Sequence, residues 1–159
     1  MRTTFIFFLA VLAWSCDSDR LYEKNHDFKN RNWPVSDNPR FDFDVRDTVS
    51  TYNLYCNIRN SVEYPYSRIF INYSLQDTTG TSLSKNMVQA FLFEEKTGRP
   101  LGSSGLGDVY DHQVAILKNY QFKKPGTYSI TFEQFMRTDT LAGILAVGFR
   151  LETTPPTKL

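Results

Sequence analysis

The residue with the clearest chemistry in this sequence is Cys16, because of what precedes it. Arg2 supplies a positive charge, Phe5 to Trp14 is an unbroken apolar run of ten residues, and Ser15 leads directly into Cys16. Such a run suits a signal peptide and is well short of the roughly 20 residues that a membrane-spanning helix needs. A small residue followed by a single cysteine is typical of bacterial lipoproteins, in which the thiol is acylated, as with palmitate, and the chain is cut just before it. We therefore predict a lipoprotein signal peptide at residues 1–15 and lipid attachment at Cys16; a plain secretory peptide is the alternative.

The other reactive side chains form no recognisable catalytic or metal-binding pattern. Cys56 shares the parity of its apolar neighbours in an alternating run, which predicts a buried small hydrophobe rather than a reactive thiol. His112 has two acids nearby, but neither it nor His26 has the spacing of metal ligands. The glycines of residues 102–108 lack the flanking strand, helix and lysine of a phosphate-binding loop, so they predict a tight loop. We expect no enzymatic activity, no metal and no cofactor.

The charge balance narrows the classes of partner. The chain has 18 basic and 17 acidic residues, and removal of the predicted signal peptide takes away Arg2, which leaves 17 of each. A neutral chain gives no electrostatic reason to bind nucleic acid or anionic head groups. Attachment to a membrane must therefore come from the acyl chains at Cys16.

Hydrophobic alternation with a period of two dominates the chain from Phe41 onward. Residues 16–40 are polar and rich in turn formers, which predicts a lipidated N-terminus and tether, with a docked segment at Phe28 and Trp33. Residues 41–152 contain about seven or eight runs rich in Phe, Tyr, Ile and Val with turn signals between them, typical of an antiparallel β-sandwich, either Ig-like or jelly-roll-like. Residues 153–159, with two consecutive prolines, predict a disordered tail.

Aromatic residues make up 15% of the chain, more than the alternating core positions require. Tyrosine and tryptophan on a sandwich surface serve as anchors in protein interfaces or as platforms for sugar rings. A coplanar row of them would favour glycan binding, and isolated ones would favour protein contacts. The candidate partner contacts lie in three segments: Trp33, Tyr64, Tyr66, Leu106, Asp108 and Tyr110.

Short motifs in order along the chain carry a family resemblance. They are Ser15-Cys16, Phe28 with Trp33-Pro34, residues 41–48, 52–55, 58–60, 64–67, 102–108, 126–128, 134–137 and 141–144. With these motifs the chain resembles the gliding-motility lipoproteins of the GldH family of the Bacteroidetes. The resemblance implies a cell-envelope lipoprotein required for gliding, tied to type IX secretion and held at the outer membrane by its lipid. Its expected partners are other gliding and secretion proteins of the envelope, with a glycan as the alternative, and it implies no catalytic residues.

Overall fold

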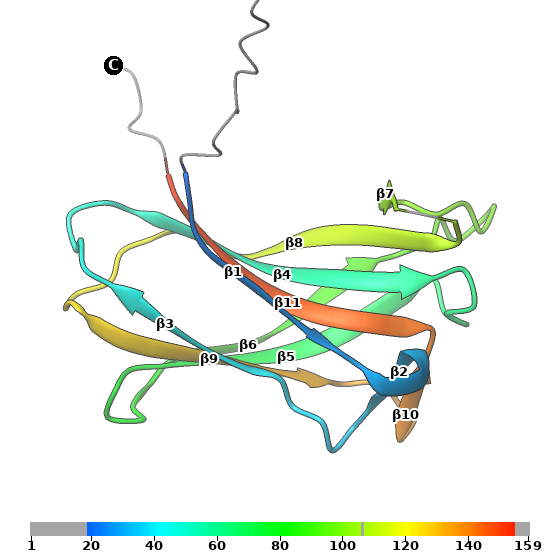
Figure 1. The fold of residues 1–159 in the computed structure, drawn as a ribbon, viewed down its shortest axis with the longest axis horizontal. Helices are drawn as coiled ribbons and strands as arrows, with labels where there is room; N and C mark the ends of the chain where they lie inside the picture. Colours follow the sequence, from blue (N-terminus) through cyan, green and yellow to red (C-terminus); the bar gives the residue numbers. More distant parts are fainter. Residues whose placement is uncertain (1–18, 106, 155–159) are drawn as a thin grey trace, which may run out of the picture.

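The computed structural model describes residues 19–105 and 107–154, and almost all of this part is β-structure. The predicted signal peptide, Cys16, Leu106 and residues 155–159 lie outside the described residues. Within the described part, the chain contains no helix long and apolar enough to cross a membrane. Figure 1 shows two antiparallel sheets stacked face to face, which confirms the predicted all-β sandwich.

The order of the strands identifies the kind of sandwich. One sheet runs β1 (Arg20–Asp27), β11 (Ile144–Thr153), β4 (Tyr52–Ser61), β8 (Val109–Tyr120) and the two-residue β7 (Ser103–Ser104). The other runs β3 (Arg40–Val45), β9 (Gly126–Gln134), β5 (Arg68–Gln76) and β6 (Ser82–Phe91). A small ribbon pairs β2 (Asn32–Pro34) with β10 (Thr140–Ala142). Eight of the described strands are long: β1, β3, β4, β5, β6, β8, β9 and β11. Among them β1 pairs with β11, β4 with β8, β3 with β9 and β5 with β6. Numbered one to eight along the chain, these pairs are 1 with 8, 3 with 6, 2 with 7 and 4 with 5. This is the jelly-roll arrangement, the second of the two predicted forms.

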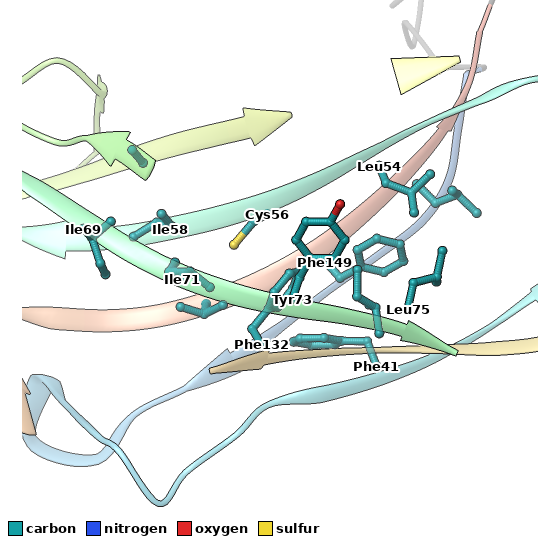
Figure 2. Packing of buried hydrophobic residues seen from close by; sticks show 14 of the residues in the cluster. Phe41, Leu54, Cys56, Ile58, Ile69, Ile71, Tyr73, Leu75, Phe132 and Phe149 are labelled. Carbon is teal, nitrogen blue, oxygen red and sulfur yellow. The ribbon is translucent and has the colours of Figure 1, made fainter. Parts of the chain in front are cut away.

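The core forms because the inward positions of facing strands are apolar. β5 alternates perfectly, with Ile69, Ile71, Tyr73 and Leu75 all buried. Figure 2 shows these side chains between the sheets, packed with the aromatic rings of Phe41 from β3, Phe132 from β9 and Phe149 from β11. Cys56 lies among them and is fully buried, as its parity predicted. At about 25 cal/mol per Å² of apolar area, burial of such side chains is the main stabilising contribution to the fold.

The N-terminal segment differs from the tether predicted for residues 16–40. Residues Arg20–Asp27 form β1, which pairs with β11 along its whole length, so the sandwich begins at Arg20 rather than at Phe41. Tyr22 explains why the strand docks: its ring lies 6.0 Å from that of Phe43 and 5.7 Å from that of Phe149. The docked segment after β1 is confirmed, because Phe28 and Trp33 are buried.

The two ends of the sandwich are built from different segments of the chain. We call the end that is nearer to Cys16 in the sequence the proximal end and the opposite end the distal end. At the proximal end β1 begins beside the last residues of β11 (Figure 1). There the Thr153 amide donates to the Asp19 carbonyl at 2.8 Å. Thr153, the first residue of the predicted tail, belongs to β11 instead. At the distal end β4 finishes at Ser61 and β11 begins at Ile144. β1 has eight residues, and at about 3.3 Å per residue it separates the two ends by roughly 25 Å.

Candidate interaction surfaces

The fold brings two of the predicted contact segments together at the distal end. The Val62 amide donates to the Asp108 carbonyl at 3.0 Å, which joins the loop after β4 to the loop before β8. A shallow depression of about 420 Å³ lies between them, and both Tyr66 and Tyr110 line it. We call residues 62–67, 93–100 and 108–110 the distal loops. The sequence predicted the two loops as separate contact segments, and the fold places them side by side.

Two of the predicted contact residues are corrected by their burial. Trp33 has no exposed surface, stacks on Phe28 at 5.1 Å and donates its indole N–H to the Asp37 carbonyl at 2.7 Å. Tyr64 is 4% exposed and donates its hydroxyl to the Arg68 carbonyl at 3.0 Å, and burial raises its pKa. Both polar groups are satisfied inside the protein, so neither ring is available to a partner.

The other predicted contact residues remain accessible to different degrees. Tyr66 is 43% exposed, and its ring packs edge-on against that of Tyr64 at 5.6 Å. Asp108 and Tyr110 are half-buried, and Asp108 accepts a hydrogen bond from Arg31 at 3.1 Å. Tyr66 is therefore the aromatic side chain that the distal loops present most openly.

The glycines before β8 support the prediction of a tight loop. Gly107 has a φ of +71°, a conformation that side chains other than glycine adopt at a cost. A Cβ at Gly102 would lie 2.6 Å from Nε2 of His112, so no larger residue fits without movement. Gly107 therefore serves the turn itself, and Gly102 allows close packing against β8 at His112.

Next to the distal loops lies an apolar patch that sequence reasoning missed. It occupies the outer face of the four-stranded sheet and borders a hollow of about 450 Å³ that Arg137 also lines. Phe135 is 61% exposed and Met87 46% exposed, both unusual for large apolar side chains. Because Tyr66 belongs to both, the patch and the distal loops form one continuous surface. We define the apolar patch as Tyr66, Phe70, Met87, Phe135 and Met136.

The outer face of the five-stranded sheet is polar and contains a groove of about 320 Å³. Arg59 donates to both carboxylate oxygens of Asp111, at 2.7 and 3.2 Å, and this pairing raises the pKa of the guanidinium. Asn57 donates to the Glu23 carboxylate at 2.9 Å. The charged groups that line the groove therefore bind one another. No Phe, Tyr or Trp side chain of the described residues lines it, so it lacks a platform for sugar rings.

The described residues contain no group of three or more His, Cys, Asp or Glu side chains placed to hold a metal ion. Burial raises the pKa of the Cys56 thiol, which opposes formation of the reactive thiolate. Burial also lowers the pKa of His112, partly offset by the nearby Asp111 carboxylate. Nε2 of His112 is buried without a hydrogen-bond partner among the described residues.

Comparison with known proteins identifies the family. The sequence profile of the GldH lipoproteins matches residues 20–151, which spans β1 to the end of the sandwich. The chain belongs to the GldH lipoprotein family. The matched region begins at β1, in agreement with the structural boundary of the domain rather than with the predicted one.

Two curated members of the family match over nearly their full length. A protein of Christiangramia forsetii, named a gliding motility lipoprotein GldH homolog, is 30% identical over 94% of each chain. The gliding motility lipoprotein GldH of Flavobacterium johnsoniae is 26% identical over 90% of this chain and 91% of its own. Among solved structures, the infectious bursal disease virus Gx strain matches with a TM-score of 0.35 and 11% identity, over 89% of this chain and 31% of the viral chain. A similarity this low supports no argument.

Proposed function

We propose that this protein is a lipid-anchored module of the cell envelope that binds other proteins of the gliding and type IX secretion machinery. The binding site is its distal surface, by which we mean the distal loops together with the apolar patch. The protein is anchored at Cys16, at the outer membrane, and performs no enzymatic step. The observation that supports an interaction role is the continuity of the distal loops with the apolar patch. Such an exposed apolar area with a polar rim is typical of a protein-binding site.

The family supports the biological setting of the proposal. The curated relatives are named gliding motility lipoproteins, and they align with nearly all of this chain. The lipoprotein signal that we predict at Ser15-Cys16 agrees with this name.

The geometry separates the proposed anchor from the proposed contact surface. Three peptide steps lead from Cys16 to Asp19, and fully extended they span about 11 Å. The sheet then begins at once, so the lipid would hold the proximal end close to the membrane. The distal loops, roughly 25 Å further along the strands, would face away from it. This arrangement presents the distal surface to partners rather than to the bilayer.

Glycan binding is the second candidate function, because the polar groove offers carboxamide, carboxylate and guanidinium groups on one open face. The apolar patch is a poorer sugar platform, since its most exposed ring, Phe135, has no polar group and lies beside methionines. Screening the soluble domain against a broad glycan array tests this candidate. A hit that the Asn57→Ala variant abolishes would favour glycan binding, and binding to no glycan would leave the protein-binding proposal.

The first experiment replaces Cys16 with serine in the native host and follows lipid labelling, fractionation and spreading motility together. We expect the label and the membrane association to be lost and motility to fail. Motility with a fully soluble protein would contradict the need for an anchor.

The second experiment tests the distal surface itself. The Phe135→Asp variant places a charge in the apolar patch, and Val49→Asp is the matched control because Val49 is 86% exposed in the loop between β3 and β4. We expect both proteins to reach the membrane, and only Phe135→Asp to abolish spreading. Equal motility of the two variants would contradict a contact role for the patch.

A further inference from the structure

The two sheets leave four edges, and three of them carry features that oppose pairing with another chain. Natural sheets protect their edges with charged side chains and with irregular pairing, since an unpaired strand offers free N–H and C=O groups. Beyond the two-residue β7, β8 is the edge of its sheet; its pairing with β4 shifts register at two places, and Asn119 has a φ of 52°. The other two protected edges carry many charged residues: Arg20, Glu23, Lys24 and Asp27 in β1, and Arg40, Asp42 and Asp44 in β3.

The fourth edge, β6, lacks this protection. Its ten residues include a single charged side chain, Lys85, and its pairing with β5 is regular from Ser84 to Phe91. Within the described part of the chain, no strand pairs with its outer side. It is long, regular and nearly uncharged, which are the properties of a strand that accepts another strand.

The outward side chains of β6 join this edge to the apolar patch. The register pairs Gln89 with Phe70 and Phe91 with Arg68, so the odd-numbered positions of β6 face outward. Met87 belongs to the patch itself. The Arg68 guanidinium lies 5.2 Å from the centre of the Phe91 ring, which is 46% exposed. A strand placed beside β6 would therefore also bring its own alternate side chains against an apolar surface.

We propose that an extended segment of a partner protein adds to β6 as a fifth strand of the four-stranded sheet. Main-chain hydrogen bonds along β6 would give affinity, and apolar side chains at alternate positions next to Met87 would give specificity. The inference rests on the proposed function, because it names the kind of partner that the distal surface binds.

The short distance from Cys16 to the sheet argues against a second copy of this chain as the occupant. Two copies of β6 paired antiparallel would be related by a two-fold axis, so their proximal ends would point in opposite directions. With about 11 Å between each lipid and its sheet, the two anchors could not readily enter one membrane while the strands stand upright. A segment from a different protein meets no such restriction.

The experiment places p-benzoylphenylalanine at Lys85 or at Gln89 of the full-length protein in the native host and maps the crosslinked residues by mass spectrometry. The two positions are about 13 Å apart along β6, which corresponds to about four residues of an extended partner and about nine of a helical one. We expect crosslinks to one partner protein at sites about four residues apart. Sites spaced as on a helix, or adducts with a second copy of this chain, would overturn the proposal.

Variants on two edges separate a specific strand addition from loose proximity. Met87→Lys adds a charge to β6, and Leu21→Lys is the matched control because Leu21 is 54% exposed on edge strand β1. We expect Met87→Lys to lower the yield of adduct about tenfold and Leu21→Lys to leave it unchanged. The same photocrosslinking residue is also placed at Tyr66. If it gives no adduct at either position on β6 but gives one at Tyr66, strand addition is wrong and the distal contact surface stands. If Tyr66 also gives none, the proposed function fails with it.

Discussion

Gly143 and Gly80 provide a test of how the distal end is held together, because they share one backbone conformation in two different surroundings. Both have a φ of +80°. A Cβ at Gly80 would meet nothing within 4 Å, whereas a Cβ at Gly143 would lie 2.5 Å from the backbone nitrogen of Tyr64. Substitution with alanine therefore adds the same backbone strain at both sites and a steric clash at Gly143 alone.

The expected magnitudes depend on these surroundings. Alanine in the left-handed region costs about 1 kcal/mol, so Gly80→Ala should lower the free energy of unfolding by about that amount. At Gly143 the loop at Tyr64 has to move, and this disturbs two backbone hydrogen bonds of 2.8 Å, from Gly143 to the Arg31 carbonyl and from Ser61 to the Gly143 carbonyl. At about 1 kcal/mol for each bond, the total loss for Gly143→Ala is about 3 kcal/mol.

Urea denaturation of a soluble chain that begins at Asp19 measures both values. That chain retains a single tryptophan, Trp33, whose buried indole reports directly on unfolding. A loss of 3 kcal/mol should also lower the melting temperature by about 10–15 °C in a domain of this size. An equal loss of unfolding free energy in the two variants would refute the view that position 143 must be glycine because the chain passes so close to the Tyr64 backbone there.

Three further predictions concern individual side chains. Cys56 should resist a thiol reagent in the native protein and react fully in urea, as measured by mass spectrometry; rapid native labelling would contradict its burial. Because the pKa of His112 is lowered in the folded state, the unfolded chain binds the proton first. Stability should therefore fall as the pH drops below about 6.5, and a urea series from pH 7 to 5 should show this loss in the parent but not in His112→Gln. Tyr22→Ala should lower the free energy of unfolding by about 2 kcal/mol if β1 is part of the sandwich, whereas the same measurement on Leu21→Ala should show a change below about 0.5 kcal/mol.

The all-β class and most strands could be predicted because a sandwich strand with one buried face alternates plainly, as β3 and β5 do. β1 escaped because it is an edge strand whose outer face is solvated, so only Tyr22 and His26 are even half-buried. Its partner β11 lies more than a hundred residues away, and local pattern carries no information about such pairing. The order of strands in the jelly roll was out of reach for the same reason.

The candidate contact residues show a different limit of sequence reasoning. Trp33 and Tyr64 looked suited to a surface because they have polar groups, yet each finds a carbonyl acceptor inside the fold. Phe70 and Phe135 were not singled out from the sequence as contact residues, yet both line an open hollow on the outer face of the four-stranded sheet. Alternation predicts that a strand has two faces, but which face is covered depends on the second sheet.

The pairing of β1 with β11 also determines how the protein would bear load. Force transmitted between the Cys16 side of Asp19 and a partner at the distal end acts along the axis of β1. The seven residue pairs that join β1 to β11 would then be sheared together, rather than opened one after another from an end. Shearing requires many hydrogen bonds to yield at once, so the pairing of β1 with β11 resists a pull along the axis of β1 from its N-terminal end.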